Sequence, residues 1–546
     1  MEHIKILDCT LRDGGRLFNC EFSDEMILDV RKRLEASNID IIEMGFLRDE
    51  KTVNYTGNST FFTRVSQLEK FLVDKKKTCL YLAFIDYGMF DFDTLENYNG
   101  KSIDGIRFGF TKKNFDEHRK DIFDIAQIIK EKGYKLFIQD VNTPGYNDKD
   151  LLELLDLCNS ISPYSCGIVD TYGTMYADDL RHFWDIVNRN LDKDICIDFH
   201  SHNNYQMSFA LAQEFIHISE ADSMYRTIII DATLNGMGKG AGNLNTELIT
   251  DYLIRKKNYN YDFDRILDII DDYLKAIKQN NSWGYTVPAM LSGIYRSHPN
   301  NMIYLLDKFG LSSRDIKVIL SSLPPASRER YDYEKLNSMS REYLSKKIDD
   351  TYTLEYLRKI FEDKYVLLLL PGLTIRTHKN IIKDCIDKEK PLIVSVNFVS
   401  EYESSASCWC FFGSADRYLS FWKNKDFNPE KVILTSNIKN QDKSAHVINY
   451  ERLVTRINNQ FDTSSIMCLN LLKKCNVHKI FIAGFDGYSD NGTNYFDSRA
   501  FQSDNIVGHA KEVNSEIQVL FDNFCKSVKD QIDIDIITPS TFVIPA

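Results

Sequence analysis

The sequence lacks the features that mark several large protein classes. Its longest apolar run, Val366–Leu370, is far too short to span a membrane. It has no basic excess, since 67 Lys and Arg residues face 79 Asp and Glu residues and the net charge is −12, which argues against nucleic-acid binding. It also has no CxxC pair among its 12 cysteines. We therefore expect reduced, mostly buried thiols in place of a disulfide framework.

A targeting segment is also missing from the start of the chain. MEHIKILDCT runs directly into a candidate strand and has no signal-peptide pattern, so we expect a soluble cytoplasmic protein. At 546 residues with 43% hydrophobic content, the chain is too long for one core and apolar enough for two or three domains.

Residues 3–250 alternate short apolar segments with amphipathic helical ones. Eight such units at a spacing of roughly 30 residues predict an α/β fold, a (β/α)8 TIM barrel. Runs such as IIIDA and LFIQD have no polar alternation, which is typical of strands covered on both faces. The expected strands are Ile4–Leu7, Ile39–Met44, Cys79–Ile85, Gly105–Phe108, Lys135–Gln139, Cys166–Val169, Ile195–Phe199 and Thr227–Ile230.

Polar residues gather where these strands end, and that is the end at which such barrels carry their chemistry. His200 and His202 stand two apart on one strand, so their side chains point to the same side. With a carboxylate from another strand they would hold a divalent metal and leave positions for water and substrate. The strand-end residues are Arg12, Asp13, Glu43, Asp140, Asp170, His200 and His202, beside the glycine-rich segment Asn235–Asn243.

Three fragments, DCTLRDGG, DFHSHNN and DATLNGMGKGAGNLNTE, resemble the DRE-TIM metallolyases over residues 1–305. That family comprises metal-dependent pyruvate aldolases and acyl-lyases, including 4-hydroxy-2-oxovalerate aldolase-like and HMG-CoA lyase-like proteins. The resemblance implies a divalent ion, manganese or magnesium, held by Asp13, His200 and His202, with Asn243 as a further ligand. It also implies a helper Tyr on the C-terminal helices, which would be Tyr285.

Aldol cleavage of a 2-oxo acid explains why these residue types occur together. The cleavage leaves an enolate, and a metal chelated by the keto acid withdraws its charge as a Lewis acid. Arg12 can donate charge-assisted hydrogen bonds to the same oxygen. Gly14 lets the backbone approach the substrate, while Glu43 either contacts the substrate or orients Arg12.

The proton-transfer partner stays open at this point. Aldolases of this group place a His base shortly after the RDG motif, where this chain has Arg16. The remaining candidates are Tyr285, His298, Glu43 and a metal-bound hydroxide.

Beyond residue 364 the chain returns to strands alternating with helices. YVLLLLPG, PLIVSVNFV, KVILTSN, HKIFIAGFDGY and IDIDIITPS mark the expected strands, and they predict an open Rossmann-like α/β domain. The expected organisation is a barrel at 1–260, a helical extension packed on it at 261–345, a linker at 346–364 and this second domain at 365–546.

HKIFIAGFDGYSDNGTNYFD and the later NIVGHAKEVNSEI resemble the bacterial sialyltransferases of glycosyltransferase family 42. The resemblance implies a nucleotide-sugar site, with Asn397, Tyr488 and Tyr495 facing the donor and His509 as general base. Thr463–Ser465 would be the helix start that meets the nucleotide, because free N–H groups there suit an anion. The chain departs from this family after its first strand, which lacks the Gly-Pro-Ser-like turn.

Three functions remain open from the sequence. The first is a metal-dependent lyase that acts on a 2-oxo acid and an aldehyde. In this hypothesis the lyase is fused to a second domain that binds a cytidine-nucleotide sugar and can also transfer the sugar, for surface-glycan synthesis. The second is an acyl-CoA-type condensing enzyme or lyase on the same barrel. The third is a non-catalytic scaffold with a vestigial barrel. Homodimers are common for barrels of this type, so a second copy is an expected partner.

Overall fold

The computed structural model divides the chain into two compact units, Met1–Pro299 and Asn300–Ala546. Among the residues it describes, no helix has both the length and the apolarity needed to cross a membrane. The described residues are 3–222, 226–309, 311, 313–328, 332–344, 348–402, 407–422, 428–438, 444–455, 463–490, 494–496 and 510–545.

The first unit contains a closed parallel barrel of eight strands, which confirms the predicted fold class. Strand β1 pairs with both β2 and β9, so the first and last strands close the ring. A two-residue strand, β3 (Phe61–Phe62), lies beside β2 and was not predicted. The barrel strands are β1 (Ile4–Asp8), β2 (Ile41–Leu47), β4 (Leu80–Asp86), β5 (Gly105–Thr111), β6 (Lys135–Val141), β7 (Ser165–Asp170), β8 (Cys196–Ser201) and β9 (Ile228–Ala232).

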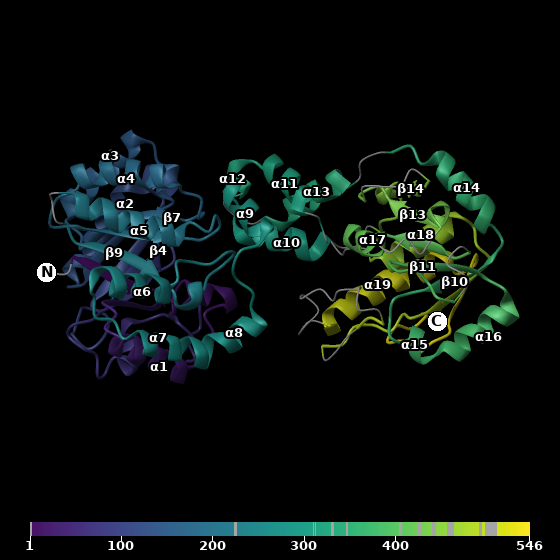
Figure 1. Ribbon diagram of the computed structural model, residues 1–546, viewed down its shortest axis with the longest axis horizontal. Helices are drawn as coiled ribbons and strands as arrows, with labels where there is room; N and C mark the ends of the chain where they lie inside the picture. The colour runs from purple at the N-terminus through teal and green to yellow at the C-terminus, as the bar shows by residue number, and fades with distance from the viewer. Residues whose placement is uncertain are drawn as a thin grey trace. The chain divides into compact units, whose positions relative to one another are not determined.

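Helices cover the outside of this barrel (Figure 1). Helix α1 illustrates why they form: Ser23 caps it by accepting a hydrogen bond from the Met26 amide at 3.1 Å. Ile27, Val30 and Leu34, at helical spacing, are fully buried against the strands. The helices of this unit are α1 (Asp24–Ala36), α2 (Lys112–Glu131), α3 (Asp148–Ile161), α4 (Ala177–Asn190), α5 (Ser208–Ala221), α6 (Thr246–Lys257), α7 (Phe263–Ile269), α8 (Lys275–Asn280) and α9 (Val287–Ile294).

The second unit is built on a seven-stranded sheet, all of whose strand pairs are parallel. Its order is β14-β13-β12-β11-β10-β15-β16, so the chain starts near the middle and reverses direction across the sheet beside β10. The strands are β10 (Tyr365–Leu369), β11 (Leu392–Val396), β12 (Trp409–Phe412), β13 (Val432–Thr435), β14 (His446–Ile448), β15 (Lys479–Ala483) and β16 (Asp533–Ile536).

Both faces of this sheet are covered, as a fully parallel sheet requires. Val366 and Leu368 of β10 belong to one hydrophobic core, and Leu367 and Leu369 belong to another, because successive strand residues point to opposite faces. The helices are α10 (Pro299–Phe309), α11 (Ser313–Ser322), α12 (Pro325–Arg328), α13 (Tyr333–Leu344), α14 (Thr351–Phe361), α15 (Thr374–Thr377), α16 (Lys379–Glu389), α17 (Ala415–Trp422), α18 (Ser464–Lys474) and α19 (Ala510–Val528).

The boundary between the units falls inside the segment expected to form a helical extension. Helices α7 to α9 lie in the first unit, and α11 to α14 lie in the second. Helix α14 occupies most of the expected linker, and its Leu357 and Phe361 are fully buried in the second core. The free cysteines expected from the sequence are found: all 12 are unbonded and 11 are buried.

Candidate metal centre and second pocket

Asp13, His200 and His202 converge at one end of the barrel although 187 residues separate the first two in sequence. One ligand atom from each lies within 4.8 Å of the others, and Asp13 Oδ2 is 3.9 Å from His202 Nε2. Asp13 stands in the turn after β1, and the histidines stand at the end of β8. One carboxylate and two imidazoles fit a divalent cation with open coordination positions.

The glycine-rich loop brings Asn243 to the same place. Its Nδ2 donates to Asp13 Oδ2 at 2.8 Å and to the Met237 carbonyl at 3.0 Å. Its Oδ1 is buried and has no hydrogen-bond partner among the described residues. A buried, unpartnered acceptor beside two imidazoles and a carboxylate is what a site that takes up a cation should contain, so the donor set fits the implied metal.

An aspartate orients one of the histidines. His200 Nδ1 is 2.9 Å from Asp231 Oδ2, an arrangement that leaves Nε2 to face the centre. Arg107 holds the same Asp231 oxygen and also donates to Asp198 at 3.0 Å. Arg107, Asp198 and Asp231 are all almost fully buried, so this charge network is the polar floor beneath the ligands.

Burial determines the protonation of the ligands in the ion-free protein. It lowers the pKa of His200 to about 3 and that of His202 to about 4, so both rings are neutral at pH 7. Burial alone would raise the pKa of Asp13, but the Arg12 guanidinium and the two imidazoles hold it well below its usual range. All three groups therefore carry the protonation state that metal binding requires.

Arg12 is fixed beside the centre by two carboxylates. Its Nε donates to Glu43 Oε2 at 2.6 Å and its Nη1 donates to Asp13 Oδ1 at 2.7 Å. The guanidinium also lies over the Phe84 ring, 4.6 Å from the centroid. Because Nη2 makes no hydrogen bond to the described residues, one donor edge stays available. Glu43 is fully buried, and its Oε2 accepts from Arg12 and lies 3.7 Å from Arg107 Nη1.

The other residues predicted for the barrel site lie in different surroundings. Gly14 is buried, and a Cβ there would come within 3.2 Å of Met237, so the glycine keeps the backbone close to the loop. Tyr285 is 52% exposed and its hydroxyl contacts the Met290 sulfur at 3.8 Å; no contact with the ligands is recorded among the described residues. His298 is half-buried, and Lys239 and Arg16 are the charges it faces.

Sequence reasoning missed Arg107 and Asp231. Both occur within apolar strand segments, GIRFGF and IIIDA, where a charged residue is costly unless another charge pairs with it. That signal was available, because each is the only charged residue in its strand run. It could have predicted a buried ion pair, although not which carboxylate orients the histidine.

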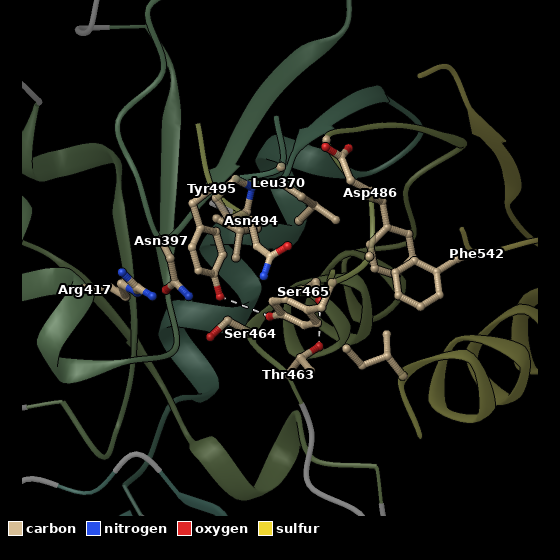
Figure 2. A pocket seen from close by; sticks show the side chains of 18 residues that line it. Leu370, Asn397, Arg417, Thr463, Ser464, Ser465, Asp486, Asn494, Tyr495 and Phe542 are labelled. Carbon is tan, nitrogen blue, oxygen red and sulfur yellow. Dashed lines mark hydrogen bonds between the residues drawn. The ribbon is translucent and has the colours of Figure 1, made fainter. Parts of the chain in front are cut away.

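A second pocket in the C-terminal unit collects residues from several distant segments (Figure 2). Asn397, Tyr488, Tyr495 and Thr463–Ser465, all predicted from the sequence, line it. It lies where β10, β11 and β15 end, at the reversal of strand order where open α/β sheets bind ligands. His509 lies outside the described residues.

Tyrosine and hydroxyl groups give this pocket its polar character. The Tyr488 and Tyr495 hydroxyls are 3.2 Å apart, and the Arg417 guanidinium lies 5.0 Å from the Tyr495 ring centroid. Burial raises the pKa of Tyr488 well above its ordinary value, so it remains a neutral donor. Thr463 caps α18, and Ser464 and Ser465 open the helix at the pocket wall (Figure 2).

The turn after β10 departs from the nucleotide-cradling turn of the sialyltransferases but still reaches the pocket. Pro371 and Gly372 line it. A Cβ on Gly372 would lie 2.5 Å from both Asp486 Cγ and the Gly484 carbonyl oxygen. The close approach of these two segments therefore requires glycine at this position.

Part of the barrel is similar to known proteins. Residues 107–273 match the HMGL-like family. The chain is 25% identical over 336 residues to the 4-hydroxy-2-oxovalerate aldolase of Carboxydothermus hydrogenoformans, which covers 59% of this chain and 92% of that protein. It is 24% identical over 270 residues to the oxaloacetate decarboxylase of Mycobacterium tuberculosis, covering 48% and 74%.

The HMG-CoA lyase of Brucella melitensis aligns with a TM-score of 0.41 and 14% identity, over 51% of this chain and 100% of that one.

Proposed function

We propose that the barrel is a divalent-metal-dependent carbon–carbon lyase that cleaves or forms an aldol of a 2-oxo acid through its enolate. Asp13, His200 and His202 converge beside the guanidinium of Arg12, which two carboxylates hold in place, and the proposal rests on this arrangement. A bound divalent ion supplies Lewis-acid polarisation of the keto acid oxygens. We propose manganese or magnesium as this ion.

Arg12 has the geometry of an oxyanion donor. Glu43 and Asp13 hold its Nε and Nη1, so Nη2 can donate to the oxygen on which charge develops without reorganisation of the side chain. In the condensation direction, C3 of the enolate forms a bond to the carbonyl carbon of the aldehyde, and the aldehyde oxygen accepts a proton. Cleavage reverses both steps.

We keep His298 among the candidate proton-transfer residues. Burial lowers its pKa to about 4, so it is neutral at pH 7 but only a weak base there. Its charged neighbours are Lys239 and Arg16, and Arg16 is 3.4 Å from Asp13 Oδ1. Glu43 is paired with Arg12 and Arg107, and Tyr285 is 52% exposed.

Pyruvate enolisation tests the proposal without knowledge of the second substrate. The purified protein, loaded with Mn²⁺ or Mg²⁺, is expected to exchange the methyl protons of pyruvate for deuterium, as followed by mass spectrometry. Asp13→Asn should abolish both stoichiometric metal and exchange. Asp178→Asn removes a carboxylate from a highly exposed position and should change neither. Exchange that is absent from the metal-loaded protein, or that persists in Asp13→Asn, would refute the assignment.

For the second unit we propose a site for a cytidine-nucleotide-activated acidic sugar, with transfer to a glycan acceptor. Six residues predicted from three separate segments line a single pocket, and this favours a ligand site over unrelated packing. The start of α18 offers amide groups to a phosphate. The neutral Tyr488 phenol adds a donor.

Calorimetric titration of cytidine mono- and diphosphate into the full chain tests this second activity. Tyr488→Phe is expected to weaken binding about tenfold, as loss of a hydrogen bond to a charged group does. Tyr352→Phe, at an exposed position, should behave as wild type. If no cytidine nucleotide binds, and His509→Ala leaves glycan transfer unchanged, the proposal fails.

A further inference from the structure

The barrel site has more cationic side chains at its rim than the binding of a metal and a 2-oxo acid requires. Arg12 is neutralised by Glu43 and Asp13. Two other cations, Arg16 and Lys239, come from different segments and interact electrostatically with Asp13.

Arg16 has no carboxylate of its own. Its Nε is 3.4 Å from Asp13 Oδ1 and its Nη2 is 3.5 Å from Asp86 Oδ2. Asp13 already accepts from Arg12, and Asp86 accepts from Arg48 at 2.5 Å. Both contacts are longer than the charge-assisted bonds that those carboxylates make elsewhere. The Arg16 side chain, 36% exposed, therefore remains able to bind an anion.

Lys239 has no ionic partner at all among the described residues. It lies in the glycine-rich loop and is half-buried, and its ammonium makes no recorded hydrogen bond or ion pair within the described part of the chain. Burial lowers the pKa of Lys239, and the nearby charge of Arg16 lowers it further. Two neighbouring cations repel each other, and an anionic ligand would reduce this repulsion.

The aromatic surroundings support the same interpretation. The guanidinium groups of Arg16 and Arg48 both lie over the Phe46 ring, at 4.6 and 4.4 Å from its centroid. A guanidinium held against a ring is partly preorganised to bind carboxylate or phosphate. Arg16, in the turn after β1, and Arg48, directly after β2, are therefore both held at the rim by Phe46.

We propose that Arg16 and Lys239 form the recognition site for an anionic group, carboxylate or phosphate, on the aldehyde that the lyase joins to or releases from the 2-oxo acid. This inference rests on the proposed lyase function and specifies its second substrate. A neutral aldehyde would leave Lys239 without an ionic partner among the described residues and Arg16 with only its two long carboxylate contacts. An acidic one places its negative end between them while its carbonyl carbon faces the metal centre.

Matched aldehydes test the inference. Succinic semialdehyde carries a carboxylate, glyceraldehyde 3-phosphate carries a phosphate, and butanal is a neutral analogue of the first. The wild-type protein is expected to prefer at least one acidic aldehyde to butanal by about tenfold or more in kcat/KM for condensation with pyruvate, the size of one charge-assisted contact. Comparison of the two acidic aldehydes shows whether the site prefers a carboxylate or a phosphate. Equal values for all three would overturn the inference.

Lysine variants identify the contact. Lys239→Met should reduce the ratio of acidic to neutral kcat/KM about tenfold, whereas Lys239→Arg should restore most of it. Lys135→Met removes the same charge at the opposite end of the barrel, where β6 begins, and should leave the ratio unchanged. An unaltered ratio in Lys239→Met would contradict the proposed role.

A binding measurement separates this inference from the lyase proposal. Calorimetry of succinic semialdehyde and butanal with the metal-loaded protein requires no turnover. A protein that lacks pyruvate exchange but still binds the acid more tightly, with the preference lost in Lys239→Met, supports the anion site and refutes the lyase. A protein that exchanges pyruvate but binds both aldehydes equally supports the lyase and refutes the anion site.

Discussion

At the residue scale, the site depends on a buried relay from Arg107 through Asp231 to His200. Each contact is short: Arg107 and Asp231 form a close ion pair, and Asp231 lies 2.9 Å from His200 Nδ1. Outer-shell carboxylates of this kind fix the tautomer of a metal-binding imidazole. Arg107 and Asp231 therefore orient the candidate ligand His200 without being ligands themselves.

Asp231→Asn is expected to weaken metal binding by about 10–100-fold, the effect typical of outer-shell substitutions. The amide can donate to Nδ1 and so favour the wrong tautomer, in which Nε2 carries the proton. Calorimetric titration of Mn²⁺ into the metal-free protein measures the change. Asp178→Asn is the control for loss of one carboxylate, and a Kd equal to that of wild type in Asp231→Asn would contradict the relay.

The buried histidines predict a direction for the effect of pH on stability. In the folded chain the pKa values of His200 and His202 are about 3 and about 4, whereas unfolded histidines take up protons near 6.5. The unfolded chain therefore binds more protons below about pH 6.5, and the free energy of unfolding of the metal-free protein falls as the pH is lowered from 7 towards 4.

Denaturant unfolding of the metal-free protein at pH 7.5, 6.5 and 5.5 measures this slope. The double variant His200→Gln, His202→Gln removes both groups and should flatten the curve relative to wild type. A slope that is identical in the double variant and the wild type would show that these histidines do not titrate as their burial implies.

The sequence was sufficient to predict that three candidate ligands meet and insufficient for the residues that support them. The i, i+2 spacing of His200 and His202 depends on backbone geometry, Asp13 was assigned through the family resemblance, and these three side chains do meet. The pairing of Arg107 with Asp198 and Asp231 depends on which interior side chains share a layer. Which interior side chains share a layer is decided only when the barrel closes, so the sequence alone does not show it.

At the scale of elements, the glycine-rich loop controls Asn243. A Cβ on Gly238 would lie 2.4 Å from Asn243 Nδ2, a distance that no side chain tolerates. The loop thus uses a glycine to leave room for the amide that contacts Asp13.

Gly238→Ala is expected to displace Asn243 and to weaken metal binding about tenfold, the lower end of the range for supporting residues. A double-mutant cycle with Asn243→Ala, measured by Mn²⁺ titration, tests the cause. In the Asn243→Ala background the added methyl group should have no further effect. Additive losses would place the effect elsewhere in the loop.

Element prediction missed three short strands. The eight barrel strands follow the expected segments, because continuous apolar runs mark strands buried on both faces. Strands β3, β12 and β14, of two, four and three residues, were not predicted, although the four-residue strands β13 and β16 were. Each is defined by pairing with a longer neighbour, which is tertiary information.

At the scale of the whole molecule, the two units have separate hydrophobic cores. One cluster lies entirely within residues 4–283, and two others lie within 357–542. Among the described residues, none of these three clusters draws members from both units. Separate cores predict separate unfolding transitions.

Differential scanning calorimetry of the full chain should therefore resolve two transitions. A metal at 100 times its Kd adds about 2.7 kcal/mol to the unit that binds it, so a chelator should lower one midpoint and leave the other unchanged. Cytidine monophosphate should raise the second midpoint alone. A single transition that moves as a whole with either ligand would contradict this separation.

The distribution of the candidate metal ligands along the chain has a consequence for biosynthesis. Asp13 is made long before His200, His202 and Asn243, which emerge from the ribosome at least 187 residues later, and β1 must wait for β9 before the ring can close. A nascent chain that ends before residue 200 has only one of the three proposed ligands. Cation capture is thereby postponed until translation of the barrel is nearly finished, and ion uptake by stalled ribosome complexes of increasing length would report the moment of closure.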